Sequence, residues 1–319
     1  MSTGGVAHWS LMGRCGPMEH LRAQIAQIAP SDVRVHVYGE TGTGKEKVAR
    51  ALHRLSTRAG RPCVAVNIAA VPDELFGSEM FGHVKGAFTG AVTDREGHVA
   101  RADGGTLFMD EVGDMSPLAQ ARLLRFLQER EYQRVGEGRP RRADVRLISA
   151  TNVDLEERVE AGRFRADLLF RLRELTLVVP PLRERGGDIL YLAHHFLRLQ
   201  AAVRNEKPPT LAPATEAILL RCPWPGNVRQ LEGEMKRLGV VARGREVLPE
   251  DLSESVRRSA ENASASRPAG LKAEIRQVEG EAIRRALDRN AGVKARAARD
   301  LGITRQALQK KLRRLGVLV

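Results

Sequence analysis

Short apolar runs recur along the first 180 positions of the chain, and helical patterns separate them. The first run, VRVHVY (33–38), ends at glycines and precedes KVARALHRL, in which apolar residues recur at helical spacing. Four further runs have the composition of strands: CVAVNIAA (63–70), GTLFMD (105–110), VRLISATN (145–152) and LTLVVP (175–180). Because these runs alternate with helical stretches, the sequence predicts an α/β fold whose mostly parallel sheet is flanked by helices.

The strand pattern stops after PPLRER (180–185). From there to about Leu252 the apolar spacing is helical, which predicts a small helical subdomain. The following stretch, ESVRRSAENASASRPAG, is polar and rich in Ser, Ala and Gly, so we interpret it as a linker. The expected order is an α/β subdomain, a helical subdomain, a linker and a terminal unit, at residues 1–180, 181–253, 254–270 and 271–319.

The terminal unit has the pattern of a helix-turn-helix. Apolar residues in IRQVEGEAIRRALDR (275–289) recur at helical spacing, and NAGVKARAARDLG and ITRQALQKKLRRLGV follow. Ala297 and Ala298 permit close packing before a turn at Gly302, and Thr304 can cap the last helix. On that helix we expect four residues to face inward: Ala307, Leu308, Leu312 and Leu315.

The charge of this unit favours nucleic acid as its partner. The chain has a net charge of +13, and residues 271–319 hold 13 Lys and Arg against 5 Asp and Glu. Arg and Gln can contact base edges, and Lys can neutralise phosphate. The residues expected to bind DNA are Thr304, Arg305, Gln306, Gln309, Lys310 and Arg313. A basic helical hairpin that serves oligomerisation is the alternative, and the first helix could also pair two chains on a two-fold DNA site.

The overall composition is that of a globular protein. With 319 residues, 42% of them hydrophobic, the chain can form two or three packed domains. No apolar run approaches the roughly 20 residues of a membrane span, and MSTGGVAHWS lacks a basic region followed by an apolar one, so we expect a cytoplasmic protein without a membrane partner. Cys15, Cys63 and Cys222 lack metal-ligand spacing, which favours reduced thiols.

The stretch GETGTGKE lies between the first strand and its helix and has the composition of a phosphate-binding loop. Its glycines let backbone N–H groups surround a phosphate, and the helix N-terminus adds a favourable dipole. Lys45 would reach the outer phosphates, although Glu46 stands where the general motif has a metal-binding Ser or Thr. The candidate nucleotide-binding residues are Gly39, Glu40, Thr41, Gly42, Thr43, Gly44, Lys45 and Glu46.

A second motif, GTLFMDE (105–111), is an apolar strand that ends in two acids. Asp110 can hold Mg²⁺ directly or through water, and Glu111 can polarise the attacking water of phosphoryl transfer. A strand followed by an acidic turn is the plain alternative. Because both motifs occur in one alternating chain, we expect it to bind ATP and Mg²⁺.

The stretch GAFTGA predicts a flexible loop, because Gly and Ala occupy four of its six positions. Its glycines permit φ angles that other residues avoid, and its Phe and Thr could contact a partner. The candidate contact residues are Gly86, Ala87, Phe88, Thr89, Gly90 and Ala91. A glycine-rich turn whose Phe packs in the core is the alternative.

Together these motifs resemble those of the AAA+ activators of sigma-54 RNA polymerase, the bacterial enhancer-binding proteins. The resemblance covers nearly the whole chain and rests on GETGTGKE, ELFG, HVKGAFTGA, ADGGTLFMDE, FRADLLFRL, PPLRERGGDI and WPGNVRQLE. GAFTGA is highly specific to that family, and its members usually have Glu at the position of Glu46. The resemblance implies an AAA+ P-loop parallel sheet with a helical lid subdomain, plus an all-α C-terminal Fis-type helix-turn-helix domain.

The resemblance also implies roles for residues that the two motifs do not contain. Asn67 matches an asparagine of the family that restrains the catalytic glutamate. Thr151 and Asn152 match the polar sensor position after the fourth strand, and Arg229 matches a sensor arginine of the lid. In FRADLLFRL, Arg165 and Arg171 match arginines that reach the ATP of a neighbouring subunit. On one continuous helix these two would be separated by about 240°, so they need not share a face. The family assembles as hexamers, which implies a homo-oligomeric ring.

In the family, the GAFTGA loop rises when ATP is bound and pushes on sigma-54 in the closed promoter complex. The resemblance thus implies an ATP-hydrolysing activator that binds enhancer DNA and remodels sigma-54 RNA polymerase holoenzyme. One alternative is a DNA-binding regulator that uses ATP only for assembly, and another is an AAA+ remodeller of a different substrate. The organisation is similar to that of short family members without a sensory domain before the core. We therefore expect a regulatory protein to act in trans, with a second activator or the expression level as the alternative sources of control.

Overall fold

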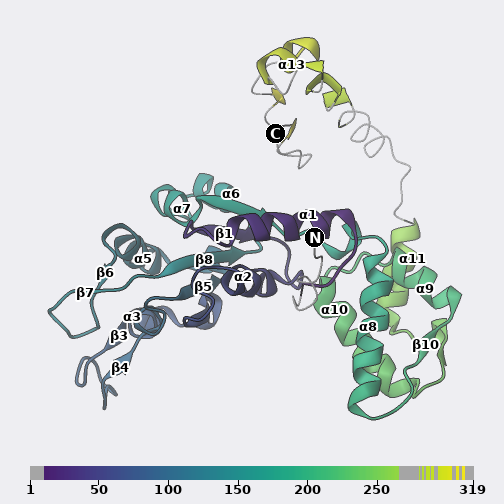
Figure 1. Ribbon diagram of the computed structural model, residues 1–319, viewed down its shortest axis with the longest axis horizontal. Coiled ribbons are helices and arrows are strands. Elements are labelled where there is room, and N and C mark those ends of the chain that lie inside the picture. Colours follow the sequence, from purple (N-terminus) through teal and green to yellow (C-terminus); the bar gives the residue numbers. More distant parts are fainter. Residues whose placement is uncertain are drawn as a thin grey trace. The chain divides into compact units, whose positions relative to one another are not determined.

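The computed structural model describes residues 11–265, 280, 282–283, 285–287, 289–290, 294–303, 307–308 and 311–312 (Figure 1). The chain forms two compact units, Met1–Arg257 and Arg258–Val319. Cys15, Cys63 and Cys222 are all free thiols, as expected. Within the described residues, no helix has the length and apolar character that crossing a bilayer requires.

The first unit contains a five-stranded sheet in which every neighbouring pair is parallel. In sheet order its strands are β2 Cys63–Asn67, β5 Thr106–Asp110, β8 Arg146–Thr151, β1 Val35–Tyr38 and β9 Leu175–Val178. Each of the five apolar runs forms one of these strands, which confirms the predicted α/β class. Since the strands are parallel, their carboxyl ends meet at one edge of the sheet, where ligands of such folds bind.

Helices cover both faces of this sheet. They are α1 Gly16–Ile28, α2 Lys45–Arg54, α3 Asp73–Phe81, α4 His98–Arg101, α5 Pro117–Glu129, α6 Leu155–Glu160 and α7 Ala166–Leu172 (Figure 1). Phe108 of β5 packs in one core with α1 and α2, whereas its neighbours Leu107 and Met109 pack in another core with α3, α5 and α7. Successive strand residues point to opposite faces, so β5 belongs to both cores.

Two short antiparallel pairs extend the first unit beyond the sheet. β3 Gly82–His83 pairs with β4 Arg95–Glu96, and β6 Glu131–Tyr132 pairs with β7 Arg141–Arg142. Two 3₁₀ turns, η1 Ile68–Ala70 and η2 Val112–Asp114, follow β2 and β5. The sequence did not predict these two-residue strands, because so short a stretch shows no apolar period.

The predicted helical subdomain follows β9. Its elements are η3 Leu182–Glu184, α8 Asp188–Val203, β10 Thr210–Leu211, α9 Pro213–Arg221, α10 Asn227–Val241, β11 Glu246–Val247 and η4 Pro249–Asp251. The expected linker at 254–270 is wrong in its first part, because α11 spans Glu254–Ala265. Val256 and Ala260 of α11 are both buried, and this spacing of four residues gives the helix an apolar side that the surrounding polar residues conceal in the sequence.

The second unit has a small apolar core. Ala297 and Ala298 of α13 Lys294–Asp300 are buried with Leu308 and Leu312, and the chain turns at Gly302 with φ 66°. The predicted close packing and turn, and the predicted inward positions of Leu308 and Leu312, are therefore present, while Ala307 is half-buried. The predicted DNA-binding residues, and Leu315, lie outside the described residues: Thr304, Arg305, Gln306, Gln309, Lys310 and Arg313.

Candidate active site

The predicted phosphate loop connects β1 to α2 at the carboxyl edge of the sheet. Gly42 and Gly44 have φ of 79° and 102°, a backbone region that favours glycine. Lys45 is the first residue of α2, and its buried Nζ donates a hydrogen bond to the Gly39 carbonyl at 2.9 Å. The ammonium group therefore lies at a helix N-terminus, where a phosphate is favourably bound.

The two acids after β5 lie beside this lysine. Glu111 Oε1 is 3.6 Å from Lys45 Nζ, and Asp110 Oδ1 accepts a hydrogen bond from the Glu111 amide at 3.0 Å. Glu111 has φ 55°, which is uncommon for a residue with a side chain and is typical of functional sites. Its buried Oε2 has no hydrogen-bond partner among the described residues, so one carboxylate oxygen is available to a water molecule or a ligand.

A cavity of about 370 Å³ brings most of the predicted nucleotide residues together. Its volume is in the range of sites for small ligands. The predicted residues that line it are Thr41, Gly42, Thr43, Gly44, Lys45, Glu46, Asp110, Glu111 and Arg229. The rest of the wall is made of residues that were not predicted, from the N-terminal part of the chain, α2, α8, α10 and the turn before α8: Leu11, Met12, Met18, Lys47, Arg185, Leu192, His195, Phe196, Leu199, Val228 and Glu232. Burial lowers the pKa of His195 below its usual value, which favours the neutral ring.

The donor set of this cavity fits Mg²⁺ better than a metal held by protein alone. No three His, Cys, Asp or Glu side chains gather as a metal site anywhere in the described part of the chain. Mg²⁺ in nucleotide sites is usually held by one or two carboxylates together with phosphates and water. Asp110, which lines the cavity at the end of β5, matches this requirement.

Asn67 lies on the strand next to Asp110. The two residues are paired in the register of β2 and β5. The Asn67 Oδ1 accepts a hydrogen bond from the Ala69 amide at 3.0 Å and so caps η1. Restraint of Glu111 by Asn67 therefore stays a prediction, since in this conformation the side chain bonds locally.

The two predicted sensor residues differ in their contacts. Thr151 is buried at the end of β8, and its Oγ1 accepts a hydrogen bond from the Val153 amide. Asn152 is exposed and donates from Nδ2 to the Thr41 hydroxyl at 2.8 Å. Of the two side chains, Asn152 is therefore the one that contacts the phosphate loop.

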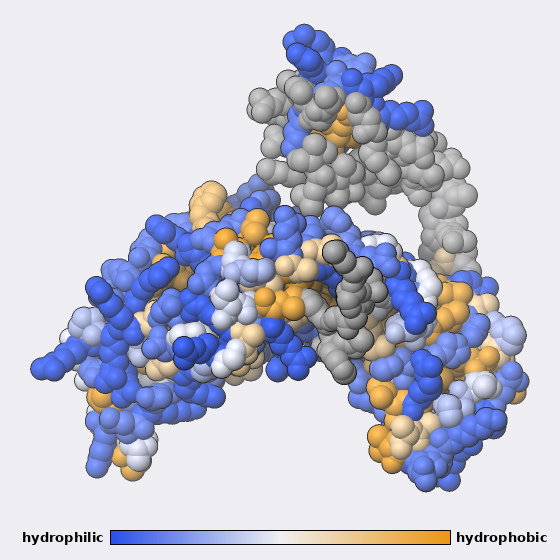
Figure 2. Space-filling model, viewed as in Figure 1, coloured by the Kyte–Doolittle hydropathy of each residue, from blue (hydrophilic) through white to orange (hydrophobic). Residues whose placement is uncertain are grey.

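The structure places both predicted arginines away from the nucleotide cavity of their own chain. Arg165 precedes α7 and pairs with Asp167 at 2.8 Å, while Arg171 is exposed in the last turn of α7. Because Arg165 lies outside the helix, the angular separation expected on one continuous helix does not apply. Phe170, the residue before Arg171, is a large hydrophobic side chain that is 77% exposed. The face of the molecule seen in Figure 2 is otherwise mostly hydrophilic, with small separate hydrophobic groups.

The helical subdomain contacts the phosphate loop directly, through residues to which the sequence analysis gave no role. Arg185 is buried and donates from Nη2 to the Thr43 carbonyl at 2.9 Å, and Arg183 pairs with Glu40 at 2.6 Å. Hydrogen bonds from the Arg183 guanidinium are the main cause that lowers the pKa of Glu40. Both arginines lie in PPLRERGGDI, one of the motifs on which the family resemblance rests, but the spacing of residues within that motif does not show which loop the arginines contact.

The GAFTGA loop lies between β3 and β4, at the end of α3. Gly86 and Gly90 have φ of 81° and 100°, and the Gly86 amide donates to the Ala91 carbonyl at 2.9 Å. Phe88 is 39% exposed, and its ring contacts His83 edge-on with 5.0 Å between centroids. Thr89 is exposed at the tip. The aromatic side chain is therefore accessible at the surface rather than buried in the core.

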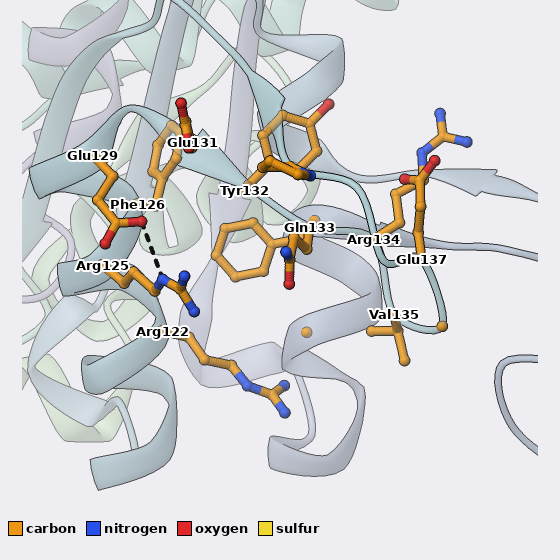
Figure 3. Close-up of a pocket in the computed structure, with 14 residues that line it drawn as sticks. Arg122, Arg125, Phe126, Glu129, Glu131, Tyr132, Gln133, Arg134, Val135 and Glu137 are labelled. Atoms are coloured by element: carbon orange, nitrogen blue, oxygen red, sulfur yellow. Dashed lines mark hydrogen bonds and ion pairs between the residues drawn. The ribbon is translucent and has the colours of Figure 1, made fainter.

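A second cavity, of about 350 Å³, lies beside the β6–β7 hairpin near this loop. Figure 3 shows Arg122, Arg125 and Glu129 projecting from α5 on one side, with Gln133, Arg134, Val135 and Glu137 of the hairpin on the other. The hairpin also contacts the GAFTGA loop, because a Cβ at Gly136 would lie 2.8 Å from the Ala87 Cβ. None of the predicted nucleotide residues lines this cavity.

Comparison with protein families covers nearly all of the chain. The Sigma-54 interaction domain matches residues 11–178, the AAA+ ATPase lid domain matches 183–269, and the Fis family of bacterial regulatory proteins matches 274–315. The helical subdomain is therefore an AAA+ lid. Its matched range includes α11, which agrees with the helical structure found there.

Individual proteins give the same result. The transcriptional regulatory protein ZraR of Salmonella typhimurium is 46% identical over 98% of this chain and 70% of its own length. The DNA-binding transcriptional regulator NtrC of Escherichia coli is 44% identical over 96% of this chain and 70% of its own. NtrX from Brucella abortus, solved in complex with ADP, superposes with a TM-score of 0.73 at 34% identity, over 97% of this chain and 69% of that one. The chain is thus an ATP-binding AAA+ ATPase, and it belongs to the family of sigma-54-dependent transcriptional activators.

Proposed function

We propose that ATP hydrolysis at the junctions of a homo-oligomeric ring moves the GAFTGA loop against sigma-54 in the closed promoter complex, while the C-terminal unit binds enhancer DNA. The main support is the position of the loop in the chain. The segment that contains it, residues 68–105, connects β2 to β5, the two adjacent strands that end at Asn67 and Asp110. The segment begins directly after Asn67, which is paired with Asp110 in the register of the two strands, and it rejoins the sheet at Thr106, the first residue of β5. A shift at Asn67 therefore acts on the first end of the segment.

The residues of the cavity suit hydrolysis of the γ-phosphate. Lys45 and the N-terminus of α2 would bind the phosphates, Asp110 would hold Mg²⁺, and Glu111 would accept a proton from the attacking water. The bound Mg²⁺ supplies charge neutralisation on the phosphate oxygens. The unpartnered Oε2 of Glu111 is the acceptor that this role requires.

The exposed positions of Arg165 and Arg171 support a ring. Neither residue lines the cavity of its own chain, and an arginine that stabilises charge on the γ-phosphate must come within contact distance of it. A neighbouring copy would supply these guanidinium groups, and a hexamer is the assembly typical of the family. Control by a regulatory protein in trans belongs to the same proposal.

Capture of sigma-54 tests the proposed function. The purified chain with ADP and a metal fluoride, which imitate the transition state of hydrolysis, should retain sigma-54, and Thr89→Ala should not. Thr93→Ala is the matched control, because Thr93 is also exposed and lies just beyond the motif. Hydrolysis without nucleotide-dependent retention of sigma-54 would support a remodeller of another substrate or a regulator that needs ATP only for assembly.

Mixed variants test the ring. Arg171→Ala and Glu111→Gln should each be nearly inactive, since a trans arginine contributes about 10³–10⁵ in rate. A mixture should regain ATPase activity, because a Glu111→Gln subunit still provides Arg171 to the intact cavity of an Arg171→Ala neighbour. Activity in the mixture that equals the sum of the separate variants would contradict donation between subunits.

A further inference from the structure

Asn227, the first residue of α10, is a buried residue whose side chain forms hydrogen bonds to the lid and to the phosphate loop. Asn227 is fully buried and has φ 51°. Its Nδ2 donates to Glu40 Oε2 at 3.1 Å and to the Thr41 carbonyl at 3.0 Å. Its Oδ1 accepts from the Leu182 amide at 2.7 Å. The amide therefore uses both donors and one acceptor, and Asn is a residue type that tolerates positive φ.

An ion pair between Arg183 and Glu40 also joins the lid to the phosphate loop. Both Arg183 terminal nitrogens bond the Glu40 carboxylate, at 2.8 and 2.6 Å. The side chains of Arg183 and Glu40 are 44% and 42% exposed, so the pair contributes little to folding stability. Its paired geometry nevertheless fixes the orientation of Glu40, so that Oε2, which accepts from Arg183, also accepts from Asn227.

The hydrogen-bonded path continues on the other side of the phosphate loop. The Thr41 hydroxyl accepts from Asn152, which follows β8, while the Thr41 carbonyl accepts from Asn227. Three side chains thus link the end of a central strand, the phosphate loop and the lid. Each step is a direct hydrogen bond, at 2.8 Å and 3.0 Å.

The lid end of this path lies next to the nucleotide cavity. Arg229, two residues after Asn227, lines the cavity, and its amide is 3.3 Å from the Gly42 carbonyl. A Cβ at Gly42 would lie 2.3 Å from the Gly226 carbonyl, so the start of α10 touches the loop backbone. The orientation of α10, and with it the position of Arg229, therefore depends on how the loop holds Asn227.

We propose that Asn227, with Glu40 and Arg183, is the positioning group through which the phosphate loop sets the lid arginine Arg229 at the nucleotide. The group acts through Arg229 and needs no contact with ATP itself. This inference rests on the ATPase activity and not on sigma-54 remodelling, so its test uses ATP alone. Its failure would leave the proposed action on sigma-54 untouched.

The test exchanges donor and acceptor at one hydrogen bond in the full-length chain. Asn227→Asp removes the donor to Glu40 and to the Thr41 carbonyl and places two carboxylates together. Glu40→Gln leaves two amides and a weaker partner for Arg183. Each single variant should raise KM for ATP or lower kcat by about tenfold, within the range for contacting residues. The double variant restores a donor and an acceptor across the contact with residue 40, although the bond to the Thr41 carbonyl stays lost, so its defect should be smaller than the product of the two.

Asn205→Asp is the matched control. Asn205 also has positive φ, at 54°, and lies in the lid, but it is exposed after α8 and away from the phosphate loop. The same isosteric change there should leave KM and kcat at their original values. Thermal unfolding of all variants shows whether a kinetic defect comes from a misfolded lid.

Arg183→Met keeps the test decisive if Asn227→Asp does not fold, because Arg183 is at the surface. It should raise KM for ATP severalfold. The emission of Trp224, three residues before Asn227 and fully buried, should change on ATP binding in a Trp9→Phe background, and Arg183→Met should reduce that change. Unchanged kinetics in Asn227→Asp and Arg183→Met, or single defects that simply multiply in the double variant, would overturn the inference.

Discussion

Around the phosphate loop, buried side chains are held by several partners each, whereas the GAFTGA loop is exposed and has few side-chain contacts. Lys45 is buried and bonds the Gly39 carbonyl, and Asn227 bonds three groups at once. In the GAFTGA loop the bonds are between backbone atoms, such as that from the Gly86 amide to Ala91, and Phe88 has one ring neighbour.

This difference separates chemistry from movement. Positioned groups accelerate a reaction only when neighbouring bonds fix their geometry, and the nucleotide cavity meets that condition. A segment that must change position needs few bonds to break, and exposed loops with few contacts open at low free energy. Substitutions at the cavity should therefore stop hydrolysis, while substitutions in the loop should affect only what hydrolysis moves.

The largest effect is expected at Glu111. Glu111→Ala should lower the rate of ATP hydrolysis by about 10²–10⁴, the usual contribution of a general base, and leave ATP binding intact. Steady-state turnover and equilibrium binding of a fluorescent ATP analogue measure the two quantities. Asp114→Ala is the control, because Asp114 is an exposed acid of the adjacent turn η2. Substantial turnover in Glu111→Ala would mean that another group activates the water.

A smaller effect, confined to the output, is expected at Thr89. Thr89→Ala should reduce transcription from a sigma-54 promoter by about 30-fold, the loss that corresponds to one strong interface contact. ATP hydrolysis by the same variant should stay at its original rate, since Thr89 is remote from the cavity lining. An equal loss of hydrolysis and transcription would remove the separation between the two regions.

The smallest effect is expected where the loop meets the fold. His83 contacts Phe88 and shares a 2.7 Å hydrogen bond with Ser78. His83→Ala should lower the free energy of unfolding by about 1–3 kcal/mol, from one aromatic contact and one hydrogen bond. Urea unfolding measures this loss, with Thr93→Ala as a control that should unfold like the original chain. An unchanged midpoint would show that the loop gains no support from His83.

Much of the nucleotide site could be predicted because its residues are close together in the sequence. The loop from Gly39 to Glu46 and the pair of Asp110 and Glu111 each follow an apolar strand, and parallel strands bring their carboxyl ends to one edge. The lid was predictable as a helical region because its apolar residues recur at helical spacing. The polar composition of α11 concealed its two buried positions, Val256 and Ala260.

The sequence by itself determined the strands, the phosphate loop, the two acids and the exposed loop, because local composition and period specify them. Only the tertiary structure decided which side chains meet across the cavity. Glu40 is 143 residues from Arg183 and 187 from Asn227, and Thr41 is 111 from Asn152. The bonds of Glu40 depend on how the lid packs on the sheet, and the bond between Thr41 and Asn152 depends on the pairing of β1 with β8. No periodicity within any one segment encodes that packing or that pairing.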